Sequence, residues 1–199
     1  MFVKKIPKEE IKHLPLLRYE GEIELIEDYT QLNKALHEIE RFDKIGFDTE
    51  SKPAFNKGEY NPVSLLQIAI PDKVYLVRIN KVGFTERLAS LFSSQNILKI
   101  GISIRDDVRD LQYLRRFIPG GIVEINSIAK ELEIEQQGVR NLSAIFLGGR
   151  VSKNQQVTNW ENPTLTLSQQ VYAATDAWVC YEIYNKLDSQ GYLEQVNEY

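Results

Sequence analysis

The chain has 199 residues, of which 43% are hydrophobic and 26% are charged, and this length accommodates one domain with a full core. Its net charge of −4 excludes a general basic field, so any contact with nucleic acid must be local or assisted by a bound cation. A single cysteine excludes an internal disulfide framework and a cysteine-based zinc cluster. No segment is as long as the roughly 18 apolar residues that a membrane span needs, and the lysine-containing amino terminus has no apolar run. We therefore expect an intracellular protein, cytoplasmic or nuclear, with no membrane partner.

The elements are expected to alternate along the chain. Residues 1–20 are rich in lysine and weakly patterned, which predicts an N-terminal extension, and residues 21–199 are expected to form a single domain. The patterns predict strands at 22–26, 44–50, 63–70, 73–79, 97–103 and near 121–125, and helices at 28–42, 84–93, 105–117 and 167–187, with two short helices and a polar loop at 149–164 before the last. Three consecutive strands followed by helix-strand-helix units indicate an α/β fold with a mixed sheet between helices.

The strand at 44–50 ends on two acids, in the stretch IGFDTE. Because side chains alternate along a strand, Asp48 and Glu50 are expected to point the same way, roughly 7 Å apart. Such a pair of like charges is costly unless a cation or a shared proton lies between them. The alternative interpretation is a solvated strand end.

A third acid lies on the inward side of the last helix. At about 100° per residue, Val179, Ile183 and Leu187 share an apolar arc, and Asp176 falls within it, with Tyr172 one turn earlier. An aspartate that points into a core is rare. Tyr172 can alternatively be a core aromatic, or form a buried hydrogen-bonded pair with Asp176.

A fourth acid is found by the same test in the helix at 105–117. Its inward arc is defined by Ile104, Val108, Leu111 and Leu114, and Asp107 lies within that arc, whereas Asp106 and Asp110 do not. The alternative is that Asp107 complements the helix dipole from the first turn.

Four inward carboxylates would repel one another in a site of low dielectric constant. Hard divalent cations such as Mg²⁺ and Mn²⁺ prefer oxygen ligands and can be held by a few carboxylates. Two such ions about 4 Å apart stabilise the attacking and leaving oxygens of a phosphoryl displacement. The acids therefore predict a cation site.

Three stretches resemble the motifs of a known superfamily. FDTE at 47–50, KIGISIRDDVRDL at 99–111 and YAATDA at 172–177 resemble, in order, the three motifs of the DEDD 3′-5′ exonucleases, and a tyrosine four residues before the last aspartate marks the tyrosine branch. The wider run NLSAIFLG, then Lys153, then NW at 159–160 and LTLSQQVYAATDAWVCYEIY is most similar to the exonuclease domain of the Werner syndrome helicase and its stand-alone relatives. The resemblance covers about residues 42–187.

This resemblance implies a ribonuclease H-like fold with a five-stranded mixed sheet flanked by helices. It also implies that Asp48, Glu50 and Asp176 hold a catalytic ion, that Asp48 bridges to a second ion, and that Asp107 reaches the second ion largely through water. Tyr172 would orient the attacking water, and Lys153 would bind phosphate. The implied cofactors are two Mg²⁺ or Mn²⁺, the partner is a nucleic acid with a free 3′ end, DNA or RNA, and the products are 5′-nucleoside monophosphates.

Two other functions are compatible with parts of this pattern. A non-catalytic member of the same fold could bind nucleic acid or a partner protein, but such a member would be expected to have lost metal ligands, and all four acids are present. A ribonuclease H-like endonuclease or a nucleotide phosphodiesterase would share the acids without needing Tyr172.

Overall fold

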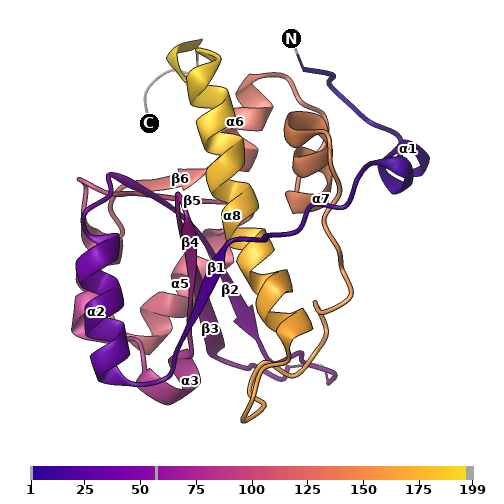
Figure 1. Cartoon of the computed structure of the whole chain (residues 1–199). Coiled ribbons are helices and arrows are strands. Elements are labelled where there is room, and N and C mark those ends of the chain that lie inside the picture. The colour runs from indigo at the N-terminus through magenta and orange to yellow at the C-terminus, as the bar shows by residue number, and fades with distance from the viewer. Residues whose placement is uncertain (1, 57, 196–199) are drawn as a thin grey trace.

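The computed structural model describes residues 2–56 and 58–195, which form a six-stranded mixed sheet between helices (Figure 1). The strands are β1 (Glu22–Ile26), β2 (Lys44–Ser51), β3 (Val63–Ile70), β4 (Lys73–Val77), β5 (Leu98–Gly101) and β6 (Ile122–Glu124). The helices are α1 (Lys8–His13), α2 (Tyr29–Ile39), α3 (Ile79–Val82), α4 (Glu86–Ser93), α5 (Arg105–Leu114), α6 (Ile125–Glu131), α7 (Val139–Leu142), which continues as a π-helical turn (Ser143–Leu147), α8 (Leu167–Ser189) and a final 3₁₀ turn (Leu193–Gln195).

The strands are ordered β1-β4-β3-β2-β5-β6 across the sheet. The antiparallel meander β2-β3-β4 and the strands β5 and β6, which run parallel to β2, account for five strands. β1 is the sixth, because all five of its residues pair in parallel with β4, from Glu22 opposite Lys73 to Ile26 opposite Val77. The mixed α/β architecture is therefore confirmed. All six strands predicted from the sequence patterns are present, one more than the five implied by the family resemblance.

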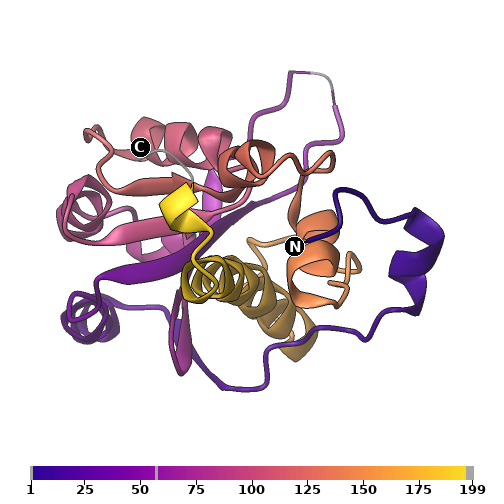
Figure 2. The same ribbon diagram turned by 90° about the horizontal axis from the view of Figure 1, so that it is seen from above.

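The two faces of the sheet are covered by different helices. On one face, Leu66 and Ile68 of β3 share a core cluster with side chains of α2, α4 and α5. On the other face, Leu65 and Ala69 share a cluster with α8, the long helix that lies across the sheet in Figures 1 and 2. The alternation along β3 therefore assigns each side of the sheet to one helical layer.

Helix α8 packs very closely on β2. It begins with a capping box in which Thr166 accepts from the backbone of Gln169 and the Gln169 side chain accepts from the backbone of Thr166. A Cβ atom added at Gly46 of β2 would lie 2.2 Å from the carbonyl oxygen of Ala177 and 3.0 Å from the backbone nitrogen of Tyr181. Only glycine permits this approach, so Gly46 sets the distance between the helix and the strand.

Two short helices were not predicted from the sequence. Helix α1 has six residues, lies in the N-terminal extension and buries only Ile11, so it offers no apolar repeat. Helix α3 has four residues and follows β4 directly.

Helix α5 ends at Leu114 rather than at the predicted residue 117. Leu114 is 38% exposed, so the inward arc of α5 ends at Leu111. In the described parts of the chain, no helix is both long enough and apolar enough to cross a membrane.

We expect Gly46→Ala to lower the stability of the protein. The added methyl group would overlap the carbonyl oxygen of Ala177, so α8 must move away from β2, at a cost of about 1–3 kcal/mol. Thermal unfolding followed by circular dichroism should show a midpoint lower by about 2–4 °C for each kcal/mol lost. An unchanged midpoint would contradict the close approach.

Candidate active site

Two of the predicted acids emerge from the central strand where its neighbour ends. β5 pairs with β2 only as far as Gly46, which lies opposite Ile100. Asp48 and Glu50 follow on the stretch of β2 that is paired with β3 alone. Phe47, the residue after Gly46, points into the core on the opposite face of the sheet. The two carboxylates therefore lie on the α8 side of the sheet, at the carboxyl ends of two parallel strands, where open α/β sheets commonly bind ligands.

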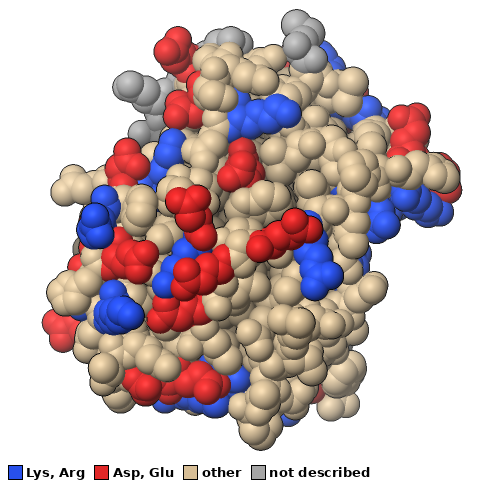
Figure 3. All heavy atoms as spheres, in the orientation of Figure 1, with Lys and Arg blue, Asp and Glu red and all other residues tan. Residues whose placement is uncertain are grey.

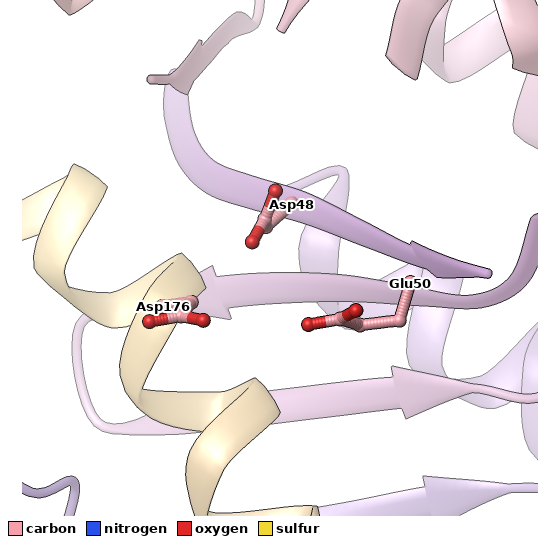
Figure 4. Close-up of side chains that lie close together, drawn as sticks. All are labelled: Asp48, Glu50 and Asp176. Carbon is pink, nitrogen blue, oxygen red and sulfur yellow. The ribbon is translucent and has the colours of Figure 1, made fainter. Parts of the chain in front are cut away.

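The third acid joins them from α8. Asp176 is only 5% exposed, and one carboxylate oxygen each of Asp48, Glu50 and Asp176 lie within 4.8 Å of one another. Figure 4 shows the three side chains directed toward a common space, two from β2 and one from the helix. Residues 128 positions apart in the sequence thus form one carboxylate cluster, which we call the acid cluster (Asp48, Glu50 and Asp176).

The fourth predicted acid lies beside the acid cluster and outside it. Asp107 is in the first turn of α5, on the opposite face of the sheet, and its carboxylate accepts a hydrogen bond from the Thr49 hydroxyl. The position agrees with the alternative of a first-turn acid, but the side chain is directed at β2 rather than at solvent. Its negative charge contributes to the raised pKa of Asp48, so it is electrostatically part of the site.

Burial makes all four carboxyl groups hard to ionise, and repulsion from the neighbouring site acids adds to this effect at Asp48 and Glu50. Burial, followed by the charges of Asp107, Asp176 and Glu50, holds the pKa of Asp48 well above its ordinary range. Burial and the neighbouring acids raise the pKa of Glu50 to about 9, and burial raises the pKa of Asp176 to about 7. Burial raises the pKa of Asp107 to about 6, against the opposing effect of the Thr49 hydrogen bond. A bound cation would reverse these shifts.

Tyr172 lies one helical turn before Asp176 and also faces the site. Burial, then the negative charges of Asp176 and Glu50, raise its pKa above the usual range of a phenol, so the hydroxyl stays protonated at neutral pH. The ring packs against Trp160 with a centroid distance of 6.0 Å, and Trp160 is fully buried. Tyr172 is half-buried and lines two cavities, so it is more than a core aromatic.

A cavity of about 390 Å³ opens beside the acid cluster and is lined by Asp48, Tyr172 and Asp176. Lys153, the predicted phosphate ligand, lies in its wall. Arg140 and Lys8 line the same cavity, and no sequence pattern distinguishes either of them from ordinary surface charge. Negative and positive side chains thus border one space, as a site for a metal ion and a phosphate group requires.

Sequence reasoning also missed two polar residues that lie beside the acids. Thr49 contacts Asp107 by its hydroxyl group. Gln67 of β3 lies directly opposite Asp48, is fully buried, and neither atom of its amide has a hydrogen-bond partner among the described residues. A buried amide without partners is uncommon. The available signal was an uncharged polar residue within the apolar run VSLLQIAI.

The donor set fits a hard divalent cation. Asp48, Glu50 and Asp176 can hold such an ion, since they present carboxylate oxygens close together at a buried position. Cys180, one turn beyond Asp176, is buried, and its thiol pKa is raised well above the usual value by burial and by the charge of Asp48. The thiol therefore stays neutral, and the site offers oxygen rather than sulfur ligands.

A mixed sheet crossed by a long helix, with carboxylates gathered at the strand ends, places the protein in the class of ribonuclease H-like nucleases. Residues 23–191 match the family described as 3′-5′ exonuclease, and the chain belongs to this family. The resemblance drawn from the three motifs is thereby confirmed.

Similar proteins are found in animals. The bifunctional 3′-5′ exonuclease/ATP-dependent helicase WRN of Mus musculus is 33% identical over 162 residues, which cover 77% of this chain and 11% of that protein. The exonuclease mut-7 homolog of Aedes aegypti is 26% identical over 198 residues, covering 86% of this chain and 27% of that protein. The crystal structure of the Aedes aegypti Nibbler EXO domain has a TM-score of 0.79 at 25% identity and covers 89% of this chain and 92% of that one. The chain thus spans a small part of both full-length relatives and nearly all of the isolated domain, and the ribonuclease H-like fold is confirmed.

We expect Glu50→Gln to raise the unfolding midpoint of the metal-free protein at about pH 8. The pKa of Glu50 is about 9 in the folded state against about 4.3 in an unfolded chain, so the folded protein binds more protons between these values. The free energy of unfolding therefore falls as the pH rises through this window. Glutamine removes the charge and so the pH dependence that it causes, which thermal unfolding at several pH values would measure.

The same variant should lose the stabilisation that the unaltered protein gains from Mg²⁺ or Mn²⁺, because one carboxylate of the acid cluster is missing. Glu20→Gln is the matched control, since Glu20 is exposed and forms no ion pair within the described residues. A Glu50→Gln protein that melts no higher than the unaltered one in metal-free buffer at pH 8 would refute the raised pKa assigned to Glu50.

Proposed function

We propose that this chain is a metal-dependent 3′-5′ exonuclease, which hydrolyses the terminal phosphodiester bond of a DNA or RNA strand and releases 5′-nucleoside monophosphates. The observation that carries the proposal is the convergence of Asp48, Glu50 and Asp176 next to a protonated Tyr172. Membership of the 3′-5′ exonuclease family and the similarity to the exonuclease domains support it. A free 3′ end is then the part of the nucleic acid that enters the cavity.

The acids would hold two Mg²⁺ or Mn²⁺ ions. Asp48, Glu50 and Asp176 would bind one, with Asp48 shared between the two and Asp107 reaching the second largely through water. Bound ions of this kind neutralise charge on a phosphodiester and lower the pKa of coordinated water. Asp107 is not one of the three acids whose oxygens lie within 4.8 Å of one another, and its hydrogen bond to Thr49 suits a less direct role.

Tyr172 would position the attacking water. Its hydroxyl remains protonated, so it is a hydrogen-bonding group and not a strong base. The oxygen of that water forms a bond to the terminal phosphorus, and the bond from phosphorus to the 3′ oxygen of the preceding nucleotide breaks. The 3′ oxygen takes up a proton and becomes the new end of the strand. Lys153, in the wall of the same cavity, would bind a phosphate oxygen.

Asp48→Asn and Asp176→Asn should each abolish digestion of a 5′-labelled oligonucleotide in Mg²⁺ or Mn²⁺, because each removes one negative ligand from the acid cluster. The matched control is Asp106→Asn, since Asp106 is adjacent to Asp107 but has a side chain 72% exposed and paired with Arg109. Denaturing electrophoresis of the products measures the loss. Retained metal-stimulated activity in either cluster variant would refute the assignment.

Two controls on this experiment separate the alternative functions. The unaltered protein should give a ladder that shortens from the 3′ end and should leave a circular single strand intact. Cuts in the circular strand would instead support an endonuclease. An unaltered protein that binds Mg²⁺ or Mn²⁺ and digests nothing would support a non-catalytic member of the family.

Tyr172→Phe should lower kcat by about a hundredfold, because it removes only the hydroxyl that orients the water. The carboxylates remain, so the increase of the unfolding midpoint caused by Mg²⁺ or Mn²⁺ should persist. Tyr113→Phe is the control, since Tyr113 is 69% exposed on α5. Single-turnover digestion measures the rate, and an unchanged kcat in Tyr172→Phe would exclude a role of the phenol in the hydrolysis step.

A further inference from the structure

The N-terminal extension is attached to the domain on both sides of helix α1. Before the helix, Ile6 and Gln136 exchange hydrogen bonds of 2.8 and 3.1 Å, and the backbone nitrogen of Glu135 donates to Lys4 at 2.9 Å. Residues 4–6 are therefore bound to the turn that precedes α7, and α1 lies beside α7 in both Figure 1 and Figure 2. The extension precedes the 23–191 segment that matches the family.

After the helix, the extension is bound to the segments that carry the site. Leu17 donates to the carbonyl of Arg150 at 2.8 Å, and the backbone nitrogen of Arg150 donates to Pro15 at 2.9 Å. The backbone nitrogen of Tyr19 donates to the hydroxyl of Thr175 at 3.0 Å, next to Asp176. Because it is held at both ends, α1 has a fixed position relative to the acid cluster.

One face of α1 borders the candidate active site. Lys8 lines the same cavity as Asp48, Tyr172 and Asp176. Lys12, four residues later and so on the same side of the helix, lines the adjoining cavity, which shares Lys153 with the first. The two glutamates of α1, at positions 9 and 10, line neither of these cavities.

Most of these cations lack an acidic partner. Within the described residues, Lys8, Arg140 and Lys153 form no ion pair, whereas Lys12 is paired with Glu9 at 2.9 Å. In Figure 3, acidic and basic side chains are interspersed over the face shown. By contrast, the cavity beside the acid cluster is bordered by these unpaired cations. Such an arrangement suits a ligand that carries several negative charges along its length.

We propose that residues 8–18 form one wall of the path by which a nucleic-acid strand enters the site, with Lys8, and secondarily Lys12, binding backbone phosphates together with Arg140 and Lys153. That the bound strand is a nucleic acid rests on the proposed function. The wall itself lies in the N-terminal extension, outside the 23–191 segment that matches the family. Phosphates are recognised by charge, so these contacts would strengthen binding without reading the base sequence.

The test measures binding of a 5′-fluorescent single-stranded oligonucleotide by the full chain carrying Asp48→Asn, without divalent ions, over a range of salt concentrations. For a single strand, the slope of log K against log salt is about 0.7 per phosphate contact. Adding Lys8→Ala should weaken binding several-fold and reduce the slope by about 0.7, and adding Lys12→Ala as well should reduce it further. Lys8→Arg keeps the charge and should restore both quantities.

Lys34→Ala is the matched control, since Lys34 is an exposed lysine on α2 with no ion pair among the described residues. Equal affinities and slopes for Lys8→Ala and Lys34→Ala would overturn the proposal, as would failure of the Asp48→Asn chain to bind the oligonucleotide. If Lys8→Ala weakens binding but the unaltered protein digests nothing, the proposed binding wall stands and the exonuclease assignment is refuted. Failure of this proposal is therefore distinguishable from failure of the proposed function.

Discussion

Repulsion among buried carboxylates is the constraint on which the site depends. Two unit charges roughly 5 Å apart at an effective dielectric constant of about 20 repel by about 3 kcal/mol, and Asp48, Glu50 and Asp176 form three such pairs. This sum is comparable to the whole stability of a typical domain, about 5–15 kcal/mol. The metal-free protein therefore keeps some of these groups protonated, as their raised pKa values indicate, and a divalent cation is the partner that lets all of them ionise.

The scaffold keeps the acids together despite this repulsion. β2 is paired with both β3 and β5 as far as Gly46, and the backbone at Asp48 remains paired with Gln67 of β3, which limits any shift that would relieve the repulsion. Helix α8 is fixed against β2 by the close approach at Gly46, and its first turn is fixed by the Thr166 capping box. Because the site is assembled before any ligand binds, the free-energy cost of reorganising it on binding is small.

The sequence predicts those features that follow from local periodicity. The pattern at 63–70 gives β3 with its observed bounds, and the helical arc around Asp176 identifies an inward acid that is buried in the structure. Features that depend on tertiary contacts are not visible in the same way. Gly46 reads as an ordinary strand glycine until α8 is placed on it, and the bond from Thr49 to Asp107 joins side chains on two elements that no pattern relates. Helix α1 has too few buried residues to produce a period, so Lys8 could not be separated from other surface lysines.

The charges of the site are divided between two kinds of structure. The negative groups of the acid cluster come from β2 and α8, where their positions are fixed by the packed core. The positive groups that line the cavities come from loops and short helices, namely Lys153, Arg140 and Lys8. This division has a physical reason. The ligands of a small cation must converge within a few ångströms, whereas a long lysine or arginine side chain can reach an extended polyanion from a less exact position. Change in the cationic segments can therefore alter how a strand is held while the carboxylate geometry stays as the sheet and α8 define it.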